Sequence, residues 1–461
     1  MTGTAMRALL AERAAWWAPA LVSALVSVMI GVCAVQALGT GATNPAIREV
    51  LRREGLTPSY VSSVGTGIAV MTVPVAVIVL AVVSTSAIRG TTRDLARWRL
   101  AGAAAPLLSA IVMGRLLLAV LLGALLGTAA TALLGGSLAE LLNAAILPEL
   151  RGLRVRPAPT ALLAATLVPP TAALLSGLPA ALRGARVPAV RAVRRDPAPA
   201  GERRRRDLVG VVLGVGAVLG VAVILLRDPP DMREGEALTA GLGLLVLVLV
   251  AAGIGASVIV PAAVSVLGAM VPVPGALRRL ARDGASARAR SSGGAVVALA
   301  CGTGLLGAII GMARTSEAIA RAAGSTEEYN LVDTYIICGI IGLLSAVGGA
   351  CVVALDAGDR RREVAQLRIA GMTPRQVLGS AALEAWLLTG AVLLLTLLAT
   401  GLSTGLVVRA AAAAALPVRL VLPWAEMAVS GAGTFVVLAL ALAIPSARAL
   451  RAPLRSSLAA E

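Results

Sequence analysis

The sequence contains neither histidine nor lysine, so all 41 of its basic residues are arginine. Without lysine the chain cannot form a GxxxxGK[ST] phosphate-binding loop, in which the lysine ammonium contacts the β- and γ-phosphates of a nucleotide. Without histidine it lacks the commonest general base and the commonest metal ligand. We therefore expect a non-catalytic protein that holds no cofactor or metal ion of its own and that does not hydrolyse ATP by itself.

Charge is also scarce. Only 14% of the residues are charged, against about 25% in an average soluble domain, and 58% are hydrophobic. Uncharged stretches of about 20 residues recur along the chain, which is the length that crosses the hydrocarbon core of a bilayer as a helix. The four cysteines, at positions 33, 301, 338 and 351, each lie in such a stretch, where cysteine behaves as a small buried hydrophobe. The composition predicts an all-α polytopic membrane protein.

Ten transmembrane helices are expected, at residues 16–38, 61–87, 107–134, 159–182, 207–226, 237–260, 292–313, 332–355, 376–408 and 425–447. With the N-terminus in the cytoplasm, the segments on the inner side hold more than twice as many arginines as those on the outer side, as the positive-inside rule requires. Both termini are therefore expected on the cytoplasmic side of a plasma membrane. We expect the outer stretch 135–157 to include a helix on the membrane surface, with Leu138, Leu141, Leu142 and Ile146 on its apolar face.

Two segments repeat each other at an offset of 269 residues. Residues 93–103 read RDLARWRLAGA and residues 362–372 read REVAQLRIAGM. Each follows the second helix of a four-helix block and precedes an unusually long third helix. Six helices separate equivalent points, so the two blocks keep the same orientation and are expected to be parallel repeats.

This repeat predicts four parts. They are a first four-helix repeat at 1–182, a basic linker at 183–206, two linking transmembrane helices at 207–270, and a second four-helix repeat at 271–461. The linker holds nine arginines, which we interpret mainly as a topological retention signal and as contacts to anionic membrane lipids. Contact with a partner protein is the alternative, and no nucleic acid is expected.

The repeated segments each predict a helix, a glycine turn and a second helix. We name residues 93–103 the first elbow and residues 362–372 the second elbow. Gly102 and Gly371 stand where a helix stops, since glycine accepts the left-handed conformation after a helix C-terminus. After Gly371, Thr373 is a suitable N-cap, Pro374 a first helical residue and Gln376 the third position of a capping box. Such an elbow at the cytoplasmic surface is suited to transmit a displacement of a soluble partner to the third helix.

Residues 361–388, RREVAQLRIAGMTPRQVLGSAALEAWLL, resemble the C-terminal core of FtsX-like permeases of ABC transporters. The resemblance implies a permease that works with a separate ATP-binding subunit, expected in two copies because the chain holds two elbows. It implies export or extraction of a hydrophobic, lipid-like, peptide or antibiotic substrate, and mechanical coupling through the elbows. The implied coupling residues are Arg93, Asp94, Trp98, Arg99 and Gly102, and Arg362, Glu363, Leu367, Arg368 and Gly371.

Two other classes of function stay open at this point: an ion-driven secondary transporter and a non-transporting membrane regulator of a partner. An ion-driven transporter needs acids within the membrane, and only Glu384 stands deep in a predicted span. Arg115 occupies the equivalent position in the first repeat. We therefore expect that Arg115 and Glu384 either pair within the membrane or extend separately to the head groups.

Overall fold

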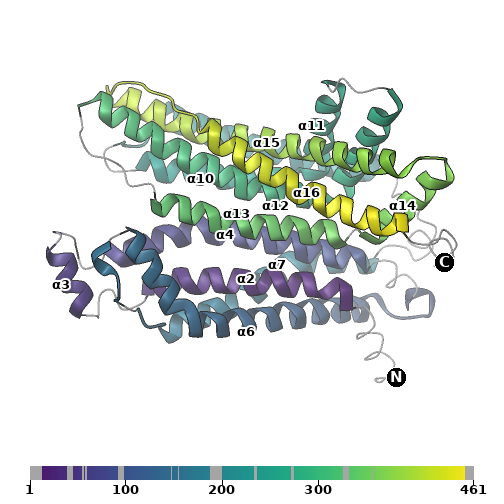
Figure 1. The fold of residues 1–461 in the computed structure, drawn as a ribbon, viewed down its shortest axis with the longest axis horizontal. Helices are drawn as coiled ribbons and strands as arrows, with labels where there is room; N and C mark the ends of the chain where they lie inside the picture. Colours follow the sequence, from purple (N-terminus) through teal and green to yellow (C-terminus); the bar gives the residue numbers. More distant parts are fainter. Residues whose placement is uncertain are drawn as a thin grey trace. The chain divides into compact units, whose positions relative to one another are not determined.

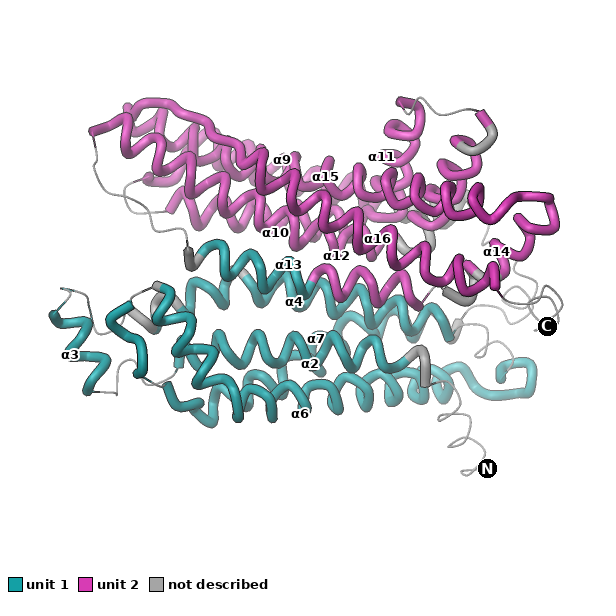
Figure 2. Tube along the Cα trace, viewed as in Figure 1, with its two compact units in different colours: residues 1–197, 330–344 teal, residues 198–329, 345–461 magenta. Residues whose placement is uncertain are grey.

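The structure is a computed structural model that describes residues 13–38, 45–53, 55, 57, 60–91, 98–146, 148–153, 155–186, 200–232, 236–270, 275–324, 332–355 and 357–451. Over these ranges all regular secondary structure is helical. The chain divides into two compact units, shown in two colours in Figure 2. Unit 1 comprises Met1–Pro197 and Asn330–Leu344, and unit 2 comprises Ala198–Tyr329 and Ser345–Glu461.

Unit 1 is built around four long helices that run side by side (Figure 1). They are α2 (Arg13–Leu38), α4 (Tyr60–Gly90), α6 (Ala105–Ile146) and α7 (Pro159–Arg186). Two short elements, α3 (Pro45–Arg53) and η1 (Pro148–Leu150), pack against one end of this bundle. The helix α3 is strongly amphipathic, and its two buried side chains, Ile47 and Leu51, join Leu150 in an apolar cluster.

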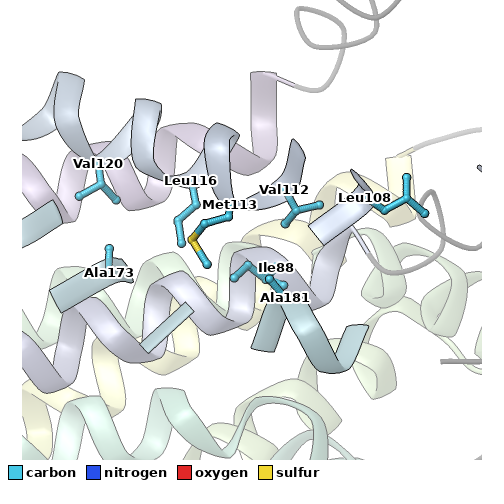
Figure 3. Close-up of a cluster of buried hydrophobic side chains, with 8 residues drawn as sticks. All are labelled: Ile88, Leu108, Val112, Met113, Leu116, Val120, Ala173 and Ala181. Atoms are coloured by element: carbon cyan, nitrogen blue, oxygen red, sulfur yellow. The ribbon is translucent and has the colours of Figure 1, made fainter. Parts of the chain in front are cut away.

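A second apolar cluster lies near the start of α6, between α4, α6 and α7 (Figure 3). Ile88 of α4 and Leu116 of α6 are among its fully buried side chains. The approach of α7 depends on Gly177, since a Cβ there would lie 2.8 Å from a methyl group of Leu116. This cluster fixes the first turns of α6, which directly follow the first elbow.

Over the described residues, unit 2 contains eight helices in part or whole (Figure 2). They are α9 (Ala200–Arg227), α10 (Glu236–Ile254), α11 (Ala256–Met270), α12 (Gly275–Ala322), the latter part of α13 (Val332–Leu355), α14 (Ala357–Ile369), α15 (Pro374–Ala413) and α16 (Trp424–Arg451). The longest interface in this unit joins α12 and α15.

Small and hydroxyl-bearing residues bring α12 and α15 close together. The hydroxyl groups of Thr303 and Thr396 lie 2.7 Å apart and share a hydrogen bond. One turn further, a Cβ on Gly307 would lie 2.5 Å from Thr400 Oγ1, so a larger residue there would displace the Thr400 side chain. Close backbone approach at glycine and hydrogen bonds between side chains are what hold helices together in lipid. The two helices are therefore packed as one pair.

The predicted number of spans is confirmed: ten described helices are long and apolar enough to cross a membrane. The chain is an all-α, multi-pass membrane protein. The division into two parallel repeats with two linking helices stays a prediction.

Two details of the prediction are wrong. The stretch 135–146 does not form a separate surface helix but continues α6 to Ile146. No proline interrupts α6, and a helix then continues until something terminates it. The predicted helix 237–260 is likewise two helices, α10 and α11, that meet at Gly255.

Candidate functional site

The second elbow joins α14 to α15 through a glycine turn. Gly371 has a φ of +87°, a left-handed conformation that a Cβ disfavours. Its N–H donates to the Arg368 carbonyl at 3.1 Å, and the Met372 N–H donates to the Leu367 carbonyl at 3.0 Å. These bonds form a Schellman motif, which satisfies carbonyls at the end of α14. The predicted turn is confirmed.

The cap of α15 follows directly. The Gln376 N–H donates to Thr373 Oγ1 at 3.4 Å, and the Thr373 N–H donates to Gln376 Oε1 at 2.9 Å. This is the predicted capping box, with Pro374 at the first helical position. A helix stop and a helix start, two residues apart, fix the angle of the second elbow through local hydrogen bonds alone.

The first elbow has the same turn. Gly102 has a φ of +90°, its N–H donates to the Arg99 carbonyl at 3.0 Å, and the Ala103 N–H donates to the Trp98 carbonyl at 3.0 Å. The following helix, α6, begins at Ala105, which is 269 residues before the start of α15 at Pro374. Arg93 and Asp94 lie outside the described residues. Where both elbows are described, their backbones agree at the predicted offset.

Each elbow presents a large apolar side chain to the solvent, just before its glycine. Leu100 is 59% exposed, and Ile369, at the equivalent position, is 62% exposed. Trp98 of the first elbow is also exposed. A bulky apolar group at the end of a charged helix is what a protein interface uses as an anchor. The two elbow tips are therefore candidate docking points for a partner protein.

The opposite face of α14 is turned into unit 2. Four side chains, at helical spacings of three and four, share this face: Arg360, Glu363, Val364 and Leu367. Val364 is fully buried in a small apolar cluster with Val377 of α15 and Ala449 of α16. This cluster holds the elbow end of α14, whereas Arg360 and Glu363 hold its other end through ionic contacts.

These ionic contacts form a closed ring of two arginines and two glutamates: Arg288 of α12, Arg360 and Glu363 of α14, and Glu384 of α15. We name it the ion-pair ring. Arg288 Nη2 donates to Glu384 Oε2 at 2.9 Å and to Glu363 Oε2 at 3.2 Å. Arg360 Nη1 donates to Glu363 Oε2 at 2.8 Å and to both oxygens of Glu384, at 3.2 and 3.3 Å. Each arginine thus contacts both carboxylates, and the ring carries no net charge.

Two members of the ring are almost fully buried in the protein. Arg360 and Glu384 are each only 2% exposed. Arg360 Nε also donates to Ser446 Oγ of α16 at 3.0 Å, so the ring connects four helices. Gly284, one turn before Arg288 on α12, makes room for Glu384: a Cβ there would lie 3.0 Å from the Glu384 Oε1 atom. Pairing and hydrogen bonds of this kind offset the cost of removing the charges from water.

Two members of the ring lie outside the candidate spans, and both keep their charge. Burial alone would raise the pKa of Glu363, but the charges and hydrogen bonds of Arg360 and Arg288 lower it below the ordinary value. Burial alone would lower the pKa of Arg288, but Glu384 and Glu363 raise it above the ordinary value. Glu363 and Arg288 are therefore both charged at neutral pH.

The sequence prediction placed Glu363, Gly371 and Gly102 at the elbows, and the structure places them there. Arg362 and Arg368 lie partly exposed on α14, and Leu367 lies at the edge of the apolar cluster. The carboxylate of Glu363 bonds to arginines of its own unit. Glu384 bonds to Arg288 and Arg360 of unit 2, whereas Arg115 belongs to unit 1, on α6. The Arg115–Glu384 pair and the coupling roles stay predictions.

Sequence reasoning missed two members of the ring, Arg288 and Arg360. The spacing of Arg360, Glu363 and Val364 on one face of α14 could have shown that the inward face of this helix begins with charges. No local signal points to Arg288, which is 96 residues from Glu384 in the chain. Over the described residues, no group of three or more histidine, cysteine, aspartate or glutamate side chains could hold a metal ion.

A comparison with known protein families matches residues 335–454 to the FtsX-like permease C-terminal family. The matched segment contains α14, α15 and α16 entirely, most of α13, and the whole second elbow. No curated protein matches the chain, and no solved structure matches it.

Proposed function

Because residues 335–454 are an FtsX-like permease C-terminal domain in a multi-pass membrane protein, we propose that this chain is the permease subunit of an ABC transporter. ATP would be hydrolysed on separate ATP-binding subunits, with which permeases of this family typically pair. The observation that carries the proposal is the position of the second elbow. It lies inside the matched domain, and the exposed Ile369 is at its tip.

The two elbows are the proposed contact with the ATP-binding subunits. The proposed coupling residues of the first elbow are Arg93, Asp94, Trp98, Arg99 and Gly102. Those of the second elbow are Arg362, Glu363, Leu367, Arg368 and Gly371. Their backbone turns are alike, and each carries an exposed apolar tip. One permease would therefore bind two ATP-binding subunits, with both elbows and both termini on the cytoplasmic side of the plasma membrane.

A hydrophobic substrate suits the spans best. Charged residues are rare in them, so a lipid-like, peptide or antibiotic molecule would be exported, or extracted from the bilayer, along apolar surfaces. An ion-driven transporter is a weaker candidate. Such a transporter needs an acid that can bind and release a cation, whereas both oxygens of Glu384 already accept hydrogen bonds from arginines.

Co-expression and purification of the chain with candidate ATP-binding-cassette proteins of its own cell tests this proposal. The expected complex contains one permease and two ATP-binding subunits, as measured by native mass spectrometry in detergent. Its ATP hydrolysis in lipid nanodiscs should depend on the permease. Absence of a stable complex, or hydrolysis that does not change when the permease is omitted, would contradict the proposal; a complex with one ATP-binding subunit would contradict the role of the first elbow.

A further inference from the structure

The helix α12 is tied to the FtsX-like domain at the elbow end of unit 2. Its Arg288 donates to Glu363 of α14 and to Glu384 of α15. The apolar cluster that holds the elbow end of α14 has only three buried members, Val364, Val377 and Ala449. A charged contact that reaches from α14 into α12 is therefore a substantial part of the anchoring of α14.

The same helix is tied to the domain a second time, far from the elbow. Arg314 of α12 forms an ion pair with Glu426 of α16. The neighbouring Thr315 makes two hydrogen bonds through its hydroxyl group: it donates to the Val421 carbonyl at 3.1 Å and accepts from the Val421 N–H at 3.1 Å. These contacts fix the loop between α15 and α16.

The stretch of α12 between the two contacts is long and closely packed. Arg288 and Arg314 are separated by roughly 39 Å along the axis of an α-helix, which exceeds the hydrocarbon thickness of about 30 Å. Between them, the Thr303–Thr396 hydrogen bond and Gly307 keep α12 against α15. A helix that is tied at both ends and packed along its length moves as a rod.

We infer that Arg288 is a positioning residue through which the second elbow moves α12 as well as α15. A displacement of α14 passes sideways through Arg288 into α12, and α12 carries it to the loop around Val421 on the other side of the membrane. This inference rests on the proposed coupling function. It goes beyond that function, in which the second elbow transmits its motion only to α15, the helix that follows it in the chain. At the offset of 269, Thr91 and Arg115 stand in place of Arg360 and Glu384, so the first elbow cannot form the same ring.

The test is a distance between α12 and α14 in the complex with the ATP-binding subunits, in nanodiscs. Spin labels are placed at two exposed positions, Ala287→Cys on α12 and Gln366→Cys on α14, after the four native cysteines are replaced by alanine. The distance between the labels is measured by pulsed electron paramagnetic resonance, once without nucleotide and once with ATP and vanadate. In the otherwise unchanged chain we expect the same distance in both states, because α12 and α14 move together.

Two variants cut the link. Arg288→Gln removes the contact from α12. The double variant Arg288→Gln with Glu363→Gln removes it without leaving a net charge, since the Arg360–Glu384 pair remains, and it serves if the single variant fails to fold. In both, nucleotide should change the distance between the labels. Permease-dependent ATP hydrolysis should fall at least about fivefold, as an ordinary coupling energy implies. Arg288→Lys, which keeps the charge, should restore part of the coupling.

Arg282→Gln is the matched control, because Arg282 is an exposed arginine of the same helix. It should leave both readouts unchanged. If the distance between the labels stays constant in the variants and their permease-dependent ATP hydrolysis is unchanged, Arg288 does not link α14 to α12. The inference then fails while the proposed function stands. If the unchanged chain shows no dependence of ATP hydrolysis on the permease, the proposed function itself fails.

Discussion

Replacement of Glu384 by glutamine should destabilise unit 2 through charge and not through shape. Glutamine has nearly the volume of glutamate, so no cavity forms. The ion-pair ring, however, would keep two arginines and one glutamate. Glu384 is 2% exposed and contacts both Arg288 and Arg360. Removal of one partner of a buried ion pair costs about 3–5 kcal/mol, because the other charge stays buried without compensation.

The structure indicates the lower half of that range. Both arginines keep a second contact, with Glu363, whose side chain is about one third exposed and partly solvated. We therefore expect a loss near 3 kcal/mol. Glu317→Gln is the control, since Glu317 pairs with the exposed Arg321 one turn away. An ion pair between residues four apart on one helix contributes only about 0.3–0.5 kcal/mol when solvent reaches it, and the Arg321 side chain is 60% exposed.

A second substitution separates charge from other effects. Arg288→Gln together with Glu384→Gln restores a neutral ring, in which Arg360 still pairs with Glu363. The double variant should be more stable than Glu384→Gln alone, with an interaction energy between the two sites of about 0.5–3 kcal/mol.

All four cysteines are buried, so the reaction of a thiol-reactive fluorophore during heating in detergent reports unfolding directly. The reasoning is refuted if Glu384→Gln unfolds at the same temperature as Glu317→Gln, or if the double variant is no more stable than Glu384→Gln alone.

Three further predictions follow from the elbows and the ring. Gly371→Ala should reduce coupling and cost about 1–2 kcal/mol, because alanine is strained at a φ of +87°, whereas Gly379→Ala in the open helical part of α15 should be neutral or stabilising; equal effects in a coupled ATPase and unfolding assay would contradict this. Acidification should destabilise the unchanged chain more than Glu363→Gln. Because the pKa of Glu363 is lowered in the folded state, its contribution to the free energy of unfolding is complete above its ordinary pKa of 4.5 and is lost as the pH falls through the lower folded-state value. Parallel plots of stability against pH for the unchanged chain and Glu363→Gln would contradict this. Glu384→Arg should be impaired whether or not Arg115→Glu accompanies it, because Arg288 and Arg360 would face a third arginine; recovery of transport in the double exchange would instead establish the Arg115–Glu384 pair.

The spans and the elbows could be predicted from the sequence because their signals are local. A run of apolar residues fixes a membrane helix regardless of its neighbours, and Gly371 with Thr373 and Pro374 fixes a turn and a cap within a few residues. The end of α6 was not predictable in the same way. Its amphipathic stretch suggested a surface helix, but nothing in the chain before Ile146 terminates the helix that precedes it.

The ion-pair ring could not be predicted because it depends on which helices pack together. Arg288 and Glu384 are far apart in the chain, and Arg288 lies in a segment with several other arginines that serve topology. Only the close packing of α12 on α15, through residues such as Gly307, selects Arg288 as the one that faces Glu384. Glu363 was predicted at the correct place, but its inward contacts with arginine were not.

The central claim, that the elbows dock on ATP-binding subunits, is tested most directly by site-specific photo-crosslinking. A photoreactive amino acid replaces Ile369 or Leu100 at the elbow tips, or Val429 on α16 as the control. Val429 is 74% exposed but lies within a span. After irradiation of the complex in nanodiscs, we expect the probes at 369 and 100 to crosslink to the ATP-binding subunit and the probe at 429 to crosslink to lipid. Crosslinks from 369 and 100 to lipid alone would contradict the claim.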